Sequence, residues 1–218
     1  MRKHFLTILF LSCLITGCNK EIGVYPLGEM KGQNPFSGSE ILSYLNNNND
    51  TIIFMGQGRY TEEIQSPFDG TGSEKYYTNE IDKCSFTDQE NKFELYIQLA
   101  SRTSSTHHGS STGYLMDIWF KDQSEISKTN CRCIASHITL PIIDHQNSNS
   151  FYDSLLISGT YYYNVVAFSN LVYSGVCTES MSADTIFYCT TNGIIKLSFN
   201  NNTSWSLLNV TKKNIKKK

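Results

Sequence analysis

Alternation of apolar and polar residues is the clearest pattern in the chain. Between residues 93 and 100, Phe93, Leu95, Ile97 and Leu99 alternate with four other residues, and residues 114–120 alternate in the same way. A period of two residues predicts two half-buried strands. The stretch 101–113 between them is rich in Ser, Thr and Gly, so we expect a hairpin with a long exposed loop.

Further strands are predicted by short apolar runs that end at turn residues, at 51–55, 134–143, 155–157, 161–168, 185–189, 194–199 and 205–208. Gly56-Gln57-Gly58 predicts a break after the first of these runs. Asn192-Gly193 is typical of a tight hairpin turn, because Gly adopts positive φ without strain. The spacing predicts an all-β fold, either a β-sandwich or a partly open antiparallel barrel.

One segment indicates a helix. Ser37 or Ser39 could cap a short helix over residues 37–45, in which Ile41, Leu42 and Leu45 share a face. Residues 18–36 show little periodicity and several Gly and Pro residues, and they predict an extended tether ahead of the fold.

The first 17 residues have the pattern of a secretory signal peptide. Two basic residues precede an apolar stretch, Phe5–Ile15, which is shorter than the ~20 apolar residues that span a bilayer. The stretch ends in Leu14-Ile15-Thr16-Gly17-Cys18, which resembles the lipobox of bacterial lipoproteins. The resemblance implies cleavage before Cys18 and attachment of acyl chains such as palmitate to that residue, which anchors the protein in a membrane.

The residue after the lipobox bears on location. Asn19 stands where an Asp often signals retention in the inner membrane of lipoproteins, so we expect a cell-envelope protein on the outer membrane, facing the periplasm or the cell surface. The predicted organisation is a signal peptide at 1–17, a lipidated tether at 18–36, a single β-rich domain at 37–211 and a basic tail at 212–218.

Composition supports sheet and excludes one class of partner. Tyr and Phe number 13 and 12, whereas Ala is scarce, which favours strands over helices. Once Arg2 and Lys3 are removed with the signal peptide, 16 basic residues face 20 acidic ones. Five of the 16 are lysines of the tail, so the body is strongly acidic, which argues against nucleic acid. The tail could contact anionic headgroups or be a solvated terminus.

The C-terminal third carries a second resemblance. Gly159-Thr160-Tyr161-Tyr162-Tyr163-Asn164-Val165, then Tyr188 with Gly193-Ile194-Ile195, then Trp205-Ser206-Leu207, are similar to the end of many uncharacterised Bacteroidota envelope lipoproteins. The chain departs from that pattern in having Cys189 inside the hairpin and a long Tyr run. The resemblance implies a lineage and no activity.

Five cysteines remain after the anchor, and an exported protein can form disulfides. We expect Cys177 to pair with Cys189, and Cys84 to pair with Cys131 or Cys133, which leaves one free thiol. Cys131 and Cys133 share a face of a strand. A metal site built from them and His137 matches no standard zinc spacing, and no metal or cofactor is predicted.

Three triplets match Asp-(Ser/Thr)-aliphatic: Asp50-Thr51-Ile52, Asp153-Ser154-Leu155 and Asp184-Thr185-Ile186. They resemble the O-glycosylation motif of Bacteroidota secreted proteins, which implies glycans on Thr51, Ser154 and Thr185 at exposed positions. The alternative is that each Asp caps a turn before a strand.

Catalytic motifs are lacking in the sequence. It contains no Gly-x-Ser-x-Gly elbow, no His-Glu-x-x-His and no phosphate loop. Glu62, Glu63 and Asp117 could form a glycosidase pair only if two carboxyls faced each other at ~5–10 Å. His107-His108 could bind a metal weakly or be solvated. We therefore expect a non-enzymatic binding or structural module with a protein or glycan partner. The alternative is a surface hydrolase or glycan-handling protein of a nutrient-uptake system.

Overall fold

The computed structural model describes residues 20–68, 74–106, 109–122, 131–142, 150–174 and 181–212, without the side chains of 103–106 and 109–112. Almost all of this is strand. The elements are β1 (Lys20–Tyr25), the 3₁₀ helix η1 (Gly28–Gln33), β2 (Glu40–Asn46), β3 (Thr51–Pro67), β4 (Lys75–Asp88), β5 (Phe93–Thr106), β6 (Gly109–Asp122), β7 (Cys131–Thr139), β8 (Ser150–Ile157), β9 (Thr160–Phe168), β10 (Val172–Ser174), β11 (Ala183–Cys189), β12 (Gly193–Phe199) and β13 (Ser204–Lys212).

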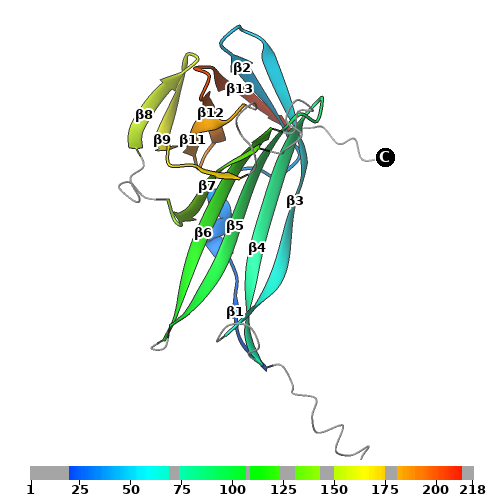
Figure 1. Cartoon of the computed structure of the whole chain (residues 1–218), viewed down its shortest axis with the longest axis vertical. Helices are drawn as coiled ribbons and strands as arrows, with labels where there is room; N and C mark the ends of the chain where they lie inside the picture. Colours follow the sequence, from blue (N-terminus) through cyan, green and yellow to red (C-terminus); the bar gives the residue numbers. More distant parts are fainter. Residues whose placement is uncertain are drawn as a thin grey trace, which may run out of the picture.

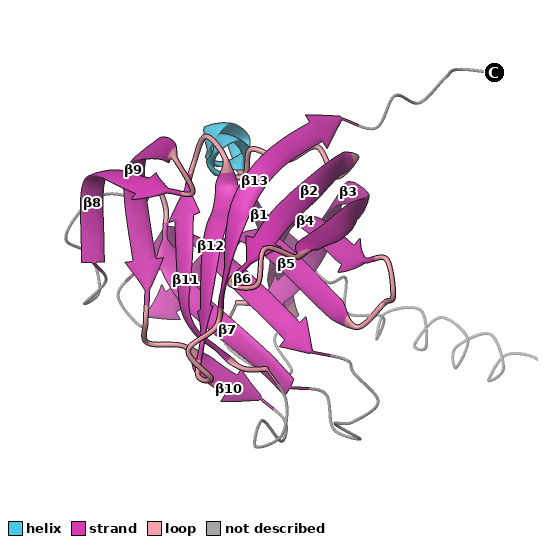
Figure 2. Ribbon diagram, turned by 90° about the horizontal axis from the view of Figure 1, so that it is seen from above, coloured by secondary structure: helices cyan, strands magenta, loops and turns pink. Residues whose placement is uncertain are grey.

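The strands form one sheet that is curled but not closed (Figures 1 and 2). Its order is β10-β7-β6-β5-β4-β3-β2-β13-β12-β11-β9-β8, so β10 and β8 lie at the two ends. These neighbours are antiparallel, whereas β1 lies off this path and pairs with β4 in parallel. The predicted all-β class is confirmed.

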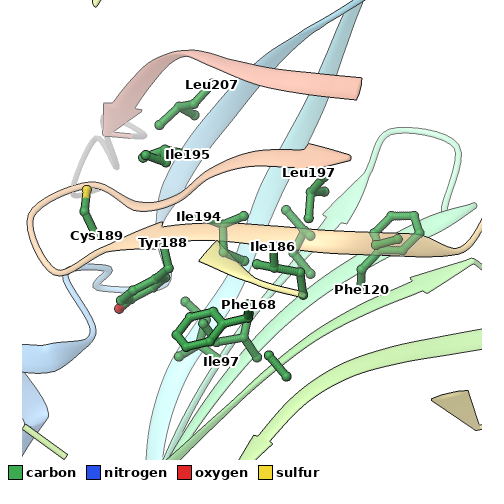
Figure 3. Packing of buried hydrophobic residues seen from close by; sticks show 14 of the residues in the cluster. Ile97, Phe120, Phe168, Ile186, Tyr188, Cys189, Ile194, Ile195, Leu197 and Leu207 are labelled. Carbon is green, nitrogen blue, oxygen red and sulfur yellow. The ribbon is translucent and has the colours of Figure 1, made fainter. Parts of the chain in front are cut away.

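The core lies inside the curl, where distant strands meet. Trp205 of β13 packs against Phe199 of β12, and also against Phe54, Phe93 and Phe120 of β3, β5 and β6, with ring centroids 4.7–6.0 Å apart. Since β6 and β12 are six places apart in the sheet, only curling brings these rings together. Figure 3 labels buried residues from both sides of this core, among them Phe120 of β6 and Leu197 of β12. Each such ring pair adds about 0.5–1.5 kcal/mol beyond area burial.

The predicted hairpin is confirmed and longer than expected. β5 and β6 pair from Phe93 and Asp122 to Thr106 and Gly109. Most of the predicted exposed loop therefore belongs to the strands, because Ser and Thr satisfy their backbone groups in the ladder as well as apolar residues do. The predicted turn at Asn192-Gly193 is also confirmed: it joins β11 to β12, and Gly193 has a φ of 75°.

The predicted helix over 37–45 is wrong, because this segment contains β2. Glu40, Leu42 and Tyr44 are buried on one face, which is the period of a strand. β2 pairs with β3 on one side and β13 on the other, and the Tyr44 hydroxyl donates to the Ile194 carbonyl. Tertiary pairing thus overrides a short helical pattern.

The segment predicted as a tether is, from residue 20 on, part of the fold. β1 pairs with β4 from Lys20 to Tyr25, and Leu27 and Phe36 are only 1% and 2% exposed. The Glu80 carboxylate accepts bonds from the Leu27 N–H and the Lys31 ammonium, each 2.6 Å long. The folded domain therefore includes residues 20–36, which the sequence pattern had placed outside it.

Among the described residues, no helix is long and apolar enough to cross a membrane. Of the predicted basic tail, Lys212 is the last residue of β13, and residues 213–218 lie outside the described part.

Candidate functional site

A cavity of about 420 Å³ lies between the β8–β9 hairpin, the end of β11 and the residue that ends η1. Its described lining combines three apolar side chains with six that carry a polar group. The lining residues are Gln33, Ile142, Phe151, Asp153, Asn164, Val166, Tyr188, Cys189 and Thr190. The size is within the range of pockets that hold small molecules.

A break in the β8–β9 pairing brings two polar side chains to the cavity. The ladder runs regularly from Ile157 and Thr160 toward the Phe151–Val166 pair, but Asp153 and Asn164 do not take part in it. Asn164 has a φ of 53°, a left-handed conformation that Asn tolerates better than most residues. The sequence carries a signal for this break, because a single Asn interrupts the apolar run 161–168, but the pattern alone does not mark Asn164 as part of a site.

Tyr188 of β11 forms the adjoining wall, next to Val166 of β9. Its side chain is fully buried, and its hydroxyl donates a hydrogen bond to the Gln33 carbonyl. Burial raises the pKa of Tyr188 well above its usual value, so the phenol stays neutral and its proton stays committed to Gln33. The Gln33 side-chain oxygen in turn accepts a 3.2 Å bond from the Ile142 N–H. This wall is therefore a rigid boundary of the cavity.

Cys189 lies at the turn between β11 and β12, at the edge of the core (Figure 3). Its thiol is free and buried. The sulfur is 3.5 Å from the Thr191 hydroxyl and 3.7 Å from the Asn192 amide oxygen. A cysteine nucleophile needs an adjacent base, and neither partner is one. These two contacts therefore do not activate the thiol.

The other face of the β8–β9 hairpin exposes aromatic side chains. Tyr161 and Tyr163 are 61% and 63% exposed, and Leu156 lies directly opposite Tyr161. Tyr162 between them is buried and donates to the Leu207 carbonyl. The Tyr run thus divides between the core and the surface, as strand alternation requires.

The structure does not bring the predicted carboxylates together. Glu62 and Glu63 are on β3 and Asp117 is on β6, three strand spacings away, or about 14 Å. Glu62 pairs with Lys83. Asp117 accepts a 2.8 Å bond from the His137 N–H. A glycosidase pair at ~5–10 Å is therefore wrong for these residues.

The predicted cysteine pairs differ from the structure. Cys84, Cys133 and Cys189 are free and buried. Cys131 is disulfide-bonded, and its partner is none of these three. Cys84 is on β4 and cannot reach β7, which lies three strands away, because a disulfide requires Cα atoms within about 7 Å. Burial raises the pKa of Cys84 to about 12 and that of Cys133 to about 11, so both thiols stay protonated. Cys177 lies outside the described residues.

Cys131 and Cys133 are both buried on one face of β7, as predicted, but His137 is exposed. Within the described ranges, no group of three or more His, Cys, Asp or Glu could hold a metal ion. His107 and His108 lie outside those ranges.

The predicted glycosylation positions differ in exposure. Thr51 and Ser154 are exposed, whereas Thr185 is half-buried opposite Ser198. The turn alternative fits Asp50, whose carboxylate accepts a 3.1 Å bond from the Asn46 side chain across the turn before β3. It does not fit Asp153 and Asp184, because both lie inside strands.

No family model matches this chain, and neither a curated protein nor a solved structure matches it.

Proposed function

We propose that this protein is a lipid-anchored lipoprotein of the outer membrane, a non-enzymatic module that binds a small hydroxyl-rich ligand of sugar size. Acyl chains on Cys18 hold it at the membrane, as the lipobox pattern implies. The observation that carries the binding role is the cavity beside the break in the β8–β9 pairing.

The lining favours sugars over charged ligands. Asp153 and Asn164 offer oxygen acceptors for hydroxyl groups, and the Asn164 amide also donates. Phe151 and Val166 offer apolar surface to the C–H face of a sugar ring. None of the described lining residues is cationic, so this part of the lining offers no charged partner for a phosphate or carboxylate. The hydrolase alternative has no comparable support, because the candidate carboxylates lie apart.

Binding is tested with the mature chain carrying Cys18→Ser, which is soluble because it lacks the lipid. Resonances of Phe151, Asn164 and Val166 are followed by NMR during titration with a panel of mono- and disaccharides. We expect at least one sugar to shift them. Asp153→Ala should then weaken that sugar about 10- to 100-fold, since a hydrogen bond to a charged group contributes about 1.5–3 kcal/mol.

The matched control is Asp184→Ala, which removes an exposed aspartate outside the cavity. It should leave sugar affinity unchanged. Equal effects of the two variants, or no shift at the cavity with any sugar, would refute the binding role.

The anchor has its own test. Intact-mass measurement of the membrane-extracted protein should show a chain beginning at Cys18 that carries acyl chains, and Cys18→Ser should move the protein to the soluble fraction. The same spectrum tests glycans on Thr51, Ser154 and Thr185: a mass equal to lipid plus polypeptide excludes them.

A further inference from the structure

Only one residue separates the proposed anchor from the sheet. Lys20 is the first residue of β1, and its N–H donates a 2.7 Å hydrogen bond to the Glu74 carbonyl. The chain gains at most about 3.6 Å per residue, so the Lys20 backbone lies within about 7 Å of the Cys18 Cα. A headgroup layer is about 5–8 Å thick. A lipid on Cys18 therefore leaves no room for a spacer.

The folded segment cannot lengthen this connection without losing contacts. β1 is paired with β4 through Tyr25, and Ser101 donates a hydrogen bond to the Tyr25 carbonyl. Beyond β1, Leu27 is buried in the core and its N–H is held by Glu80. Releasing a tether of residues 20–36 would expose this core surface and leave Glu80 without its partners.

The side chains at this end suit a headgroup layer. Lys20 and Lys75 are exposed and adjacent across the β1–β4 ladder. Phe68 is half-buried, with the Lys75 ammonium 6.0 Å from its ring centroid. Aromatic and lysine side chains are typical of membrane interfaces. Among the described residues at this end, Glu21 and Glu74 balance the two lysine charges, so we expect the contact to form without anionic lipid.

We propose that the domain stands end-on on the membrane, with the start of β1 and the adjoining ends of β3 and β4 at the headgroups. This rests on the proposed lipidation of Cys18. The long strands β3–β6 then run away from the bilayer. β8 and β9, which line the cavity, lie toward the opposite end (Figure 1), so the cavity is held away from the lipid surface.

The orientation is tested with the full lipoprotein in vesicles of phosphatidylethanolamine and phosphatidylglycerol that carry a headgroup-linked acceptor dye. A genetically encoded fluorescent residue replaces either Gln65 or Gln89, one at a time. Both are exposed glutamines: Gln65 pairs with Thr78 near the start of β4, and Gln89 follows its end. Along β4, about ten strand residues separate the level of Gln65 from that of Gln89, or about 33 Å.

We expect energy transfer to the lipid to be at least about threefold stronger from Gln65 than from Gln89, and to persist without phosphatidylglycerol. A variant with 15 Gly/Ser residues inserted between Asn19 and Lys20 adds a flexible spacer of about 20 Å. It should abolish most of that difference. Equal transfer from both positions without the insertion, or stronger transfer from Gln89, would overturn the end-on arrangement.

Intact mass of the same samples separates the two proposals. A chain with acyl groups on Cys18 and equal transfer at both positions refutes the orientation alone. A chain without acyl groups refutes the anchor and the orientation together.

Discussion

Arg59 ties the N-terminal segment to the sheet, and its replacement by Met should be strongly destabilising. Its Nε lies 3.0 Å from both oxygens of Asp82, which is 2% exposed. Its two terminal nitrogens donate to the carbonyls of Lys31, Asn34 and Phe36 at 2.6–3.1 Å. One side chain thus neutralises a buried carboxylate and satisfies three backbone acceptors.

The magnitude follows from what Arg59→Met leaves behind. A buried charge without its partner costs about 3–5 kcal/mol, and this is the expected loss in free energy of unfolding. Asp82→Leu should be costly for the same reason, because Arg59 then lacks its counter-ion. The double variant carries no unpaired charge and loses only the carbonyl contacts, so it should be less destabilised than the sum of the single variants by about 2–3 kcal/mol.

The assay is urea unfolding of the Cys18→Ser chain, with hydrogen exchange of residues 31–36 as a local readout. Lys83→Met is the matched control, because it removes another cation that pairs with a carboxylate across two strands. Its partner Glu62 is more exposed than Asp82, so the expected loss in free energy of unfolding is below about 1 kcal/mol. A loss below 1 kcal/mol for Arg59→Met, or additive single variants, would show that Asp82 is not held by a charge pair.

Three further outcomes follow from the core and the N-terminal contacts. Trp205→Ala empties the centre of the aromatic cluster and should lower the free energy of unfolding by about 3–5 kcal/mol in urea. Gly193→Ala should cost about 2–5 kcal/mol by the same measurement, because a Cβ would overlap the buried Phe36 ring at a φ of 75°; a neutral effect would contradict this packing. Burial acts to raise the pKa of Glu80, but the bonds from Lys31 and the Leu27 N–H outweigh it and hold that pKa below 4.5. Glu80 therefore stabilises the fold above pH 4.5, and this contribution disappears as pH falls through its lowered pKa, so Glu80→Gln should flatten the acid limb of the stability profile.

Strands with strict alternation could be predicted from sequence, because successive side chains of a strand point to opposite faces of the sheet and only one face is buried. Leu95, Ile97 and Leu99 are fully buried, as their period predicts. β2 could not be predicted in this way. Its residues 40–46 also fit a short helix, and what decides for the strand is hydrogen bonding to β3 and β13, which lie close by only in the folded chain.

The glycines near residue 57 show a second limit. Gly56-Gln57-Gly58 predicts a break, but β3 continues through it with a register shift. The Gly58 N–H donates a 2.9 Å hydrogen bond to the Gly38 carbonyl. A Cβ on Gly38 would overlap the backbone of Gly58, and a Cβ on Gly56 would overlap the backbone of Gly38. These glycines permit a close backbone crossing, and a sequence pattern does not distinguish that from a turn.

The candidate site was even less predictable, because it depends on residues that are far apart in sequence. Asn164 and Tyr188 lie on the neighbouring strands β9 and β11, and Gln33 joins them from the end of η1. In the sequence, Asp153 stands out only as part of a possible glycosylation triplet, because the gap in the β8–β9 pairing at Asp153 exists only in the folded sheet. By contrast, the wide separation of Glu62 and Asp117 follows directly from strand order and removes the strongest sequence argument for an enzyme.

The N-terminal segment shows why poor periodicity is not evidence of a tether. A parallel strand at the flank of β4 and a 3₁₀ turn need no amphipathic pattern, because their backbone groups are satisfied by partners elsewhere: β4, Glu80 and Arg59. In the sequence, Glu80 and Arg59 look like ordinary charged residues of strands. Once they are paired, Lys20 of the sheet follows Cys18 by two residues, whereas the predicted tether was 19 residues long. With Cys18 lipidated as proposed, the same contacts that complete the fold also set the orientation of the domain at the membrane.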